Sequence, residues 1–324
     1  MATAHCRAPE THVVEGAFTS LLGTADAPSR VVVLSRRRNI QTSTSLSEVI
    51  RCELPDGREL ELFCKYGASP AGDSYGHRGG VPYEVLVYRH VLDQSQSSAP
   101  AFFGAHTDAP GGQTWLVIEH IAGSLRMTQT DDALAMPRAA RWIGEFHRQH
   151  EDRAADDEMS FLTRYDYAFY EGWARRTARF AAPLRSRYRW LSSLCEEFPR
   201  LATVLLAAPS TIIHGECYPK NILVRDGAVY PVDWESAAIA AGEIDLASLT
   251  ERWPKEVTEQ CELAYWSARW PQRFPHYDAD RTLAVARLYL HLRWLGDRPE
   301  RTIARNSRWR FAALRSLGEQ IGVI

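Results

Sequence analysis

One short stretch of this chain constrains its fold more than any other part. Residues 214–247 read HGECYPKNILVRDGAVYPVDWESAAIAAGEIDLA. Two short apolar runs flank an Arg-Asp-Gly turn, and Asp-Gly between such runs is a strong signal for a β-hairpin. Because a hairpin brings its two ends together, we expect Asn221 and Asp233 to face one small volume, with Glu216 on the loop just before. The expected strands are residues 222–224 and 229–232.

The residue types at this place fit phosphoryl transfer. That reaction needs a carboxylate to orient or deprotonate the attacking hydroxyl, and an amide and a second carboxylate to hold magnesium at the phosphates. Glu216 would take the first role, and Asn221 with Asp233 the second. The alternative is a coincidence of loop residues, which would have to reproduce every one of these spacings. Zinc deaminases also use His-x-Glu, but with a downstream Pro-Cys-x-x-Cys, and the chain has no Cys-x-x-Cys.

These residues closely resemble the catalytic core of the aminoglycoside phosphotransferase/choline kinase family, small-molecule relatives of the protein kinases. The match covers the catalytic loop, the second metal-binding position and a following segment that braces the loop. The matching residues are His214, Gly215, Asn221, Asp233, Gly242 and the run Asp245-Leu246-Ala247. The chain departs from the family at Glu216, where the catalytic residue is normally Asp. The extra methylene moves the carboxylate outward by roughly 1.5 Å, the rise of one helical residue.

The N-terminal part has the pattern of a kinase N-terminal lobe. After an amphipathic segment at residues 11–22, strands are expected at 31–38, 46–54, 59–66 and 115–121, and a helix at 82–92. Lys65 lies near the end of the third strand, where a kinase keeps its phosphate-binding Lys, and Glu84 lies on the next helix, where its charge could hold the ammonium group. Two unrelated surface charges are the alternative for this pair. From Thr130 onward, helical periodicity dominates.

The resemblance also implies where a nucleotide binds. The family places its phosphate-covering loop between the first two strands, which here is residues 39–45, with the hydroxyls of Thr42 and Ser43 as candidate donors. This loop has no glycine, and a plain polar hairpin tip is an equally good interpretation. At the hinge after the last strand of the lobe, main-chain groups of Glu119 and Ile121 would bond adenine. The implied cofactors are ATP, or GTP, and Mg²⁺.

Composition excludes several other classes of protein. A net charge of −2 over 324 residues gives no reason to expect nucleic acid or an anionic membrane as a partner. The N-terminus lacks the apolar core of a signal peptide, and the six scattered cysteines lack metal-ligand spacing. We therefore expect reduced thiols and a cytoplasmic location. The sequence does not determine the oligomeric state.

Two basic segments bear on the acceptor. In the family, helices after the hinge and at the C-terminus form the acceptor pocket. Residues 161–190 hold seven arginines against two acids, and residues 269–324 hold eleven against five. A pocket for a polycationic aminoglycoside should be acidic, so these segments favour a neutral or anionic acceptor with an apolar or planar portion.

The sequence therefore predicts an α+β, two-lobed protein-kinase-like fold: an N-lobe of antiparallel sheet and one helix to Gly123, and a mostly helical C-lobe from residue 124. The predicted function is ATP-dependent phosphorylation of a hydroxyl on a small molecule, such as an antibiotic or other natural product, sugar, nucleoside or amino alcohol. Glu216 would be the catalytic carboxylate, Lys65 would contact the phosphates and Glu84 would hold Lys65.

The main alternative is a nucleotide-binding pseudokinase that acts as a regulator or binding module, with Glu216 marking lost chemistry. Protein kinase activity is disfavoured because only twelve residues separate Asp233 from Asp245, too few for a peptide-binding activation segment.

Overall fold

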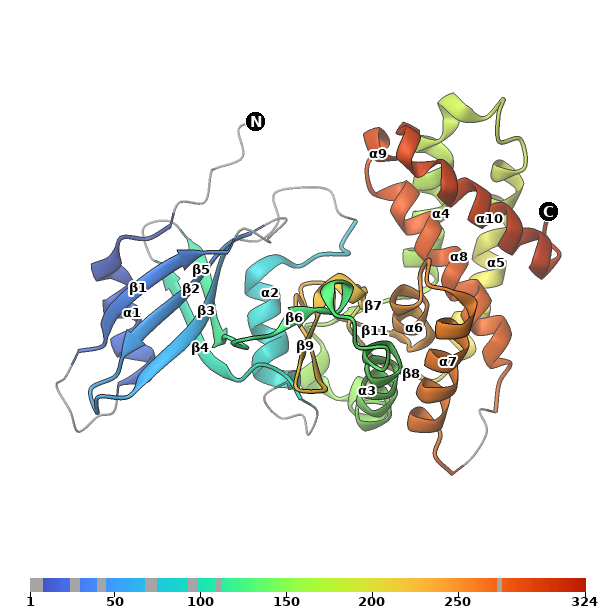
Figure 1. Cartoon of the computed structure of the whole chain (residues 1–324). Helices are drawn as coiled ribbons and strands as arrows, with labels where there is room; N and C mark the ends of the chain where they lie inside the picture. The colour runs from blue at the N-terminus through green and yellow to red at the C-terminus, as the bar shows by residue number, and fades with distance from the viewer. Residues whose placement is uncertain are drawn as a thin grey trace. The chain divides into compact units, whose positions relative to one another are not determined.

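The computed structural model describes residues 8–23, 30–39, 45–67, 75–92, 98–108, 112–272 and 276–324. The chain forms two compact units, one of residues 1–126 and 223–236, the other of residues 127–222 and 237–324 (Figure 1). The N-terminal unit therefore includes a segment, residues 223–236, that a division of the chain at Gly123 assigns to the C-terminal lobe.

The N-terminal unit is built on a five-stranded antiparallel sheet with the order β1-β2-β3-β5-β4. Its strands are β1 (Val32–Arg38), β2 (Leu46–Glu53), β3 (Glu59–Gly67), β4 (Phe102–Asp108) and β5 (Gln113–Glu119), and its helices are α1 (Thr11–Leu22) and α2 (Gly80–Val87), the latter continued by a π-helical turn, Tyr88–Leu92. The strands and helices expected from the sequence are thus confirmed. β4 was not expected.

Strand periodicity positions Lys65. Side chains alternate between the two faces of a strand. On β3, Leu62, Cys64 and Tyr66 point into the core that the sheet forms with Val14 and Phe18 of α1. Lys65 is therefore presented on the opposite face, the face on which Glu84 of α2 binds it.

The expected hairpin is also confirmed. β9 (Ile222–Arg225) pairs with β10 (Ala228–Pro231), and the short strand β6 (Leu125–Arg126) extends this sheet on the other side of β9. The two turn residues, Asp226 and Gly227, have φ of 51° and 76°. Positive φ at both central positions defines a type I′ turn, whose twist matches that of the flanking strands, and this explains why Asp-Gly is found here.

The C-terminal unit is mostly helical, around a small sheet of three strands with the order β7-β11-β8. The strands are β7 (Thr163–Arg164), β8 (Ser210–Ile213) and β11 (Ala238–Ala241). The α-helices are α3 (Ala135–Gln149), α4 (Tyr167–Phe180), α5 (Leu191–Ala207), α6 (Glu243–Leu249), α7 (Lys255–Arg269), α8 (Ala279–Asp297), α9 (Pro299–Ile303) and α10 (Arg308–Ile321). Short 3₁₀ segments are Met127–Gln129, Asp152–Ala155, Asp157–Met159, Ala182–Leu184, Pro219–Asn221 and Arg305–Ser307.

The centre of this unit is α8, which is buried along nearly its whole length. Helices α4, α5, α6, α9 and α10 all pack against it. Because the helix has no continuous solvent-facing stripe, its buried polar side chains bond to other parts of the unit. Its C-terminal half carries His291, Arg293 and Trp294, which reach other elements of the same unit. Among the described helices, none is long and apolar enough to span a bilayer.

Candidate active site

In the N-terminal unit, Lys65 of β3 lies between two carboxylates. Its Nζ is 2.7 Å from Oε2 of Glu84 on α2 and 2.5 Å from Oδ1 of Asp233, which follows the β9–β10 hairpin. Lys65 and Glu84 are 7% and 2% exposed, so this is a buried ion pair and not a pair of unrelated surface charges. The structure therefore brings together these three residues from three separate parts of the sequence.

The carboxylates around Lys65 keep its side chain protonated. Burial alone would lower the pKa of Lys65, but the carboxylates of Glu84, Asp233 and Glu235 outweigh it and raise that pKa well above its ordinary value. Lys65 is therefore an ammonium ion at neutral pH. A cationic nitrogen at this place is what binding of phosphate oxygens requires.

The backbone around Asp233 is held in an uncommon conformation. Asp233 has φ of 69°, in the left-handed region that only Gly, Asn and Asp visit readily. The next residue, Trp234, donates its backbone N–H to Oε1 of Glu84 at 3.1 Å, so Glu84 binds both Lys65 and the segment that carries Asp233. Glu84 thus fixes the two residues relative to each other.

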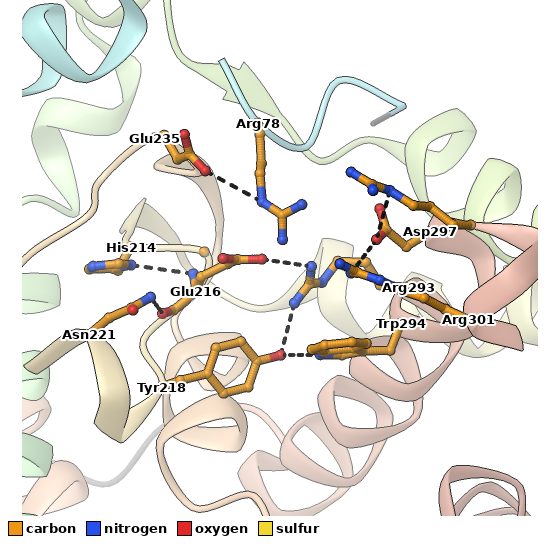
Figure 2. Close-up of polar contacts among 12 residues, drawn as sticks. Arg78, His214, Glu216, Tyr218, Asn221, Glu235, Arg293, Trp294, Asp297 and Arg301 are labelled. Carbon is orange, nitrogen blue, oxygen red and sulfur yellow. Dashed lines mark hydrogen bonds and ion pairs between the residues drawn. The ribbon is translucent and has the colours of Figure 1, made fainter. Parts of the chain in front are cut away.

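Glu235 and Arg78 form a second ion pair in this unit, which the sequence did not suggest. Nε of Arg78 is 3.5 Å from Oε1 of Glu235 (Figure 2). Burial, with Asp233 and Glu84 nearby, raises the pKa of Glu235 to about 7, although Lys65 and Arg78 act in the opposite direction. Gly79, next to Arg78, donates its N–H to the Glu235 carbonyl at 2.8 Å.

In the C-terminal unit, Asp245 braces the catalytic loop as the resemblance implies. Its carboxylate accepts the backbone N–H groups of His214 at 2.6 Å and Gly215 at 2.9 Å. It also contacts Nε2 of His147 at 3.1 Å, and Nδ1 of His147 contacts the hydroxyl of Tyr265 at 3.1 Å. Because a carboxylate only accepts, Nε2 is the donor in this bond. Burial lowers the pKa of His147 to about 4, so the ring is neutral at pH 7.

The loop itself places Glu216 on the buried side of the unit. Gly215 adopts φ of 79°, which turns the chain immediately before Glu216. Glu216 is only 5% exposed, and its backbone carbonyl accepts Nδ2 of Asn221 at 3.0 Å. Since Nδ2 is used in this bond, Oδ1 is the atom that Asn221 can offer to a cation.

The Glu216 side chain has an ionic partner that sequence reasoning missed. Nη1 of Arg293 on α8 donates to Oε1 of Glu216 at 3.1 Å, and Nη2 donates to the hydroxyl of Tyr218 at 2.8 Å (Figure 2). Nε1 of Trp294 donates to the same hydroxyl at 2.9 Å. Burial would lower the pKa of Arg293, but Tyr218 and Glu216 hold it above its ordinary value, so Arg293 remains charged.

The contact with Arg293 gives a physical reason for the extra methylene of Glu216. The side chains of Arg293 and Glu216 are 3% and 7% exposed, and the guanidinium fixes the carboxylate at the end of the longer side chain. A buried charge pair of this kind costs several kcal/mol when one partner is removed. No spacing rule points to Arg293, because 77 residues separate it from Glu216.

The sequence predicts a magnesium ion at Asn221 and Asp233, and each of these residues carries an oxygen donor. Magnesium prefers one or two carboxylate or carbonyl oxygens from the protein and takes its other ligands from phosphates and water. Asp233 carries a carboxylate in the N-terminal unit, and Asn221 carries the amide Oδ1 in the C-terminal unit. Within the part of the chain that the structure describes, no group of three or more His, Cys, Asp or Glu side chains gathers as a metal site. Binding of magnesium by Asn221 and Asp233 stays a prediction.

The remaining nucleotide-binding predictions concern the hinge and the loop between the first two strands. Glu119 ends β5, where its N–H donates to the carbonyl of Ala101 at 2.9 Å, and Ile121 follows as a buried residue. Thr42 and Ser43 lie outside the described residues. The roles of these four residues in nucleotide binding stay predictions.

Comparison with known proteins identifies the family. Similar solved structures include a choline kinase from Streptococcus pneumoniae (TM-score 0.60, 14% identity, covering 95% of this chain and 98% of that one) and a macrolide 2′-phosphotransferase from Brachybacterium faecium (0.56, 16%, 94% and 97%). Another is the GDP complex of an aminoglycoside 2′-phosphotransferase (0.62, 13%, 97% and 98%).

At these identities the likeness shows the fold, which is protein-kinase-like, as the sequence predicted. Comparison with curated protein sequences found no match. The model of the phosphotransferase enzyme family matches residues 81–283, which is more than half of the chain. The chain belongs to the phosphotransferase enzyme family.

Proposed function

We propose that this phosphotransferase transfers the γ-phosphoryl group of ATP or GTP to a hydroxyl of a small molecule. The observation that carries the proposal is the buried cluster of Lys65, Glu84 and Asp233, with Nζ of Lys65 2.7 Å and 2.5 Å from the two carboxylates. A structural ion pair needs one carboxylate. Two carboxylates leave an excess of negative charge beside Lys65, which suits a magnesium ion that arrives with the phosphates of a nucleotide.

A nucleotide donor is supported by the solved relatives. The aminoglycoside 2′-phosphotransferase has been solved with GDP, and the choline kinase with AMP. In this chain, Lys65 would contact the phosphates and Glu84 would hold Lys65 in place. Asn221 and Asp233 would hold magnesium, which when bound neutralises the charge of the transferred phosphoryl group.

On the acceptor side, Glu216 would orient the attacking hydroxyl and accept its proton. Arg293 holds the carboxylate at 3.1 Å and Tyr218 holds Arg293. The side chain is therefore fixed before the substrate arrives, and pre-positioning of a reacting group lowers the barrier to reaction. The candidate acceptors are hydroxylated natural products such as antibiotics, sugars, nucleosides and amino alcohols. The basic character of the two segments that would build the pocket argues against a polycationic aminoglycoside.

The test is a phosphoryl-transfer assay with a panel of these acceptors, in which ADP release is measured with and without acceptor and magnesium. Release that requires both supports the proposal. The matched control is Lys65→Met, which removes the ammonium group but keeps much of the apolar stem. Acceptor-dependent turnover that is unchanged in this variant would overturn the role of the cluster.

One observation favours a second candidate, a nucleotide-binding module without transfer activity. The carboxylate of Glu216 is already bound by a buried guanidinium, which occupies one of its two oxygens. Such a module would bind ATP with magnesium and bind the small molecule, yet release no ADP. Calorimetric binding of both ligands, without turnover on a ligand that binds, would favour this candidate.

A further inference from the structure

A pocket of about 620 Å³ lies in the C-terminal unit, and its lining contains none of the residues assigned to catalysis. Its walls are residues 186–190, which lead into α5, and one face of α10. Arg308, Phe311, Ala312 and Arg315 follow the i, i+3, i+4, i+7 spacing of a single helix face. The lining contains neither Glu216 nor Arg293.

The pocket is positively charged without matching acids. Four arginines line it, Arg187, Arg189, Arg308 and Arg315, and the lining contains no acidic residue. Arg315 binds Glu319 at 2.8 Å. The other three are exposed, and none of them forms an ion pair with a carboxylate of the described residues.

Some other exposed arginines of the unit have carboxylate partners: Arg175 on α4 binds Glu171, and Arg200 on α5 binds Glu197, each at 2.8 Å. At the pocket, three arginines without such a partner lie together. Like charges held close together repel one another, and an anion bound among them offsets that repulsion.

One wall of the pocket is aromatic. The rings of Tyr188 and Phe311 stack in parallel, with centroids 4.2 Å apart and planes 6° apart, which joins residues 186–190 to α10. Trp190 meets Tyr188 edge-on at 6.2 Å, and the guanidinium of Arg187 lies 5.5 Å from the Tyr188 ring centre. Tyr188 and Trp190 are only partly buried, so flat apolar surface adjoins the guanidinium groups.

The opposite side of α10 has a different environment. Arg310 contacts Nδ1 of His291 on α8 at 3.1 Å and binds Glu251, between α6 and α7, at 2.7 Å. Its positive charge is therefore matched within the unit. The contrast shows that the lack of acids is a property of the pocket face of α10 and not of the whole helix.

We propose that this pocket binds a small anion that joins a flat ring to a phosphate group. Guanidinium groups bind phosphate oxygens through paired N–H donors, and the planar part of the ligand packs on the aromatic wall. The site is a second ligand site, independent of the proposed transfer reaction. A ligand there bridges α10 and the segment before α5, and so stabilises the folded chain by mass action.

The test uses the full chain and three probes measured by titration calorimetry: 1-naphthyl phosphate, 1-naphthol and inorganic phosphate. We expect 1-naphthyl phosphate to bind more tightly than either of the others, because only it uses both the charge and the ring. Its affinity should fall as salt is raised, since screening weakens exposed charges. Titrations with ATP and magnesium present should show the same binding, because the catalytic residues do not line this pocket.

The variant Arg187→Gln/Arg308→Gln should weaken binding of 1-naphthyl phosphate by about tenfold or more, through loss of two charged contacts. The matched control is Arg141→Gln/Arg148→Gln, which removes two exposed arginines of α3 in the same unit and should bind as the wild type does. Equal thermal midpoints would show that both variants are folded.

Equal affinity of the pocket variant and the wild type would overturn the site. Inorganic phosphate that binds as tightly as 1-naphthyl phosphate would overturn the role of the ring. Complete displacement of 1-naphthyl phosphate by ATP with magnesium would show that the probe binds at the nucleotide site and not in this pocket. None of these outcomes depends on whether phosphoryl transfer is found.

Discussion

The contact between Glu216 and Arg293 joins a catalytic-loop residue that departs from the family pattern to a buried arginine. The family resemblance predicts Asp at position 216, and the chain has a longer carboxylate whose end is fixed 3.1 Å from a buried guanidinium. An Asp side chain would stop short of that guanidinium by roughly the length of the missing methylene. We therefore regard the two residues as one functional pair.

Glu216→Gln should lower kcat by about a hundred- to ten-thousand-fold, the usual contribution of a positioned acid or base. Gln keeps the size of the side chain and an oxygen for Arg293, but it cannot accept a proton from the hydroxyl. Glu216→Asp should also be slower than the wild type, because its carboxylate loses the contact with Arg293. Steady-state kinetics on the true acceptor measures both. A Gln variant with near wild-type turnover would rule out this role for Glu216.

Asp233 permits a clean substitution, because Asn tolerates the same left-handed backbone at φ of 69°. ATP with magnesium should raise the thermal midpoint of the wild-type chain, since ligand that binds only the folded state stabilises it. Asp233→Asn removes the charge but keeps the shape, and should abolish most of this shift. Differential scanning fluorimetry measures it. A full shift in the variant would place the metal elsewhere.

At the scale of single elements, α8 carries a histidine that couples stability to pH. His291 is buried, and its Nδ1 accepts a hydrogen bond from Arg310 at 3.1 Å, while Glu251 lies 3.8 Å away. Burial and the charge of Arg310 lower the pKa of His291 to about 3. A histidine whose pKa is lower in the folded state favours folding above its unfolded pKa, and this contribution is lost as the pH falls.

The free energy of unfolding should therefore fall as the pH drops from 6.5 to 5, by about 2 kcal/mol from His291 alone. His147, with a pKa of about 4, acts in the same direction. His291→Asn keeps an acceptor for Arg310 and does not titrate, so the variant should lose about 2 kcal/mol less than the wild type over this range. Urea unfolding at several pH values measures the difference. Parallel pH profiles for the two proteins would contradict the assignment.

The elements also show what sequence reasoning can and cannot recover. Lys65, Glu84 and Asp233 were predicted together because each follows a local signal: a strand end, a first helical turn and a hairpin. β4 was missed because Gly104 and Ala105 weaken its strand signal, and its register shifts between Phe102 and Gly104.

Contacts between side chains far apart in the sequence were not predictable. Arg293 lies on a helix that is buried along nearly its whole length, so its position there suggests only a place in the core. Only the folded structure shows that Arg293 binds Glu216. The same holds for Tyr218, whose hydroxyl accepts bonds from both Arg293 and Trp294.

At the scale of the whole molecule, charge should decide which acceptors are used. Apart from the four arginines that line the separate pocket, the two segments expected to build the acceptor pocket hold fourteen arginines against seven acids. Aminoglycosides carry several ammonium groups, and like charges weaken binding and slow the encounter, most of all at low salt.

Neutral glycosides, nucleosides or macrolides should therefore be phosphorylated in preference to kanamycin-type compounds. The comparison is of kcat/KM for the panel at low ionic strength. Efficient phosphorylation of the polycation, with the neutral compounds inert, would show that these segments do not form the acceptor pocket.

The division of the chain into two units has a consequence for its synthesis. The chain passes from one unit to the other after residues 126, 222 and 236, so the N-terminal unit is assembled from two separate pieces. Asp233 and Trp234, which bind Lys65 and Glu84, belong to the second piece. On the ribosome, where the N-terminal end emerges first, the five-stranded sheet can form early. Asp233 can reach Lys65 only after the second piece has emerged, so this charge cluster is completed late, when about half of the other unit has already been made.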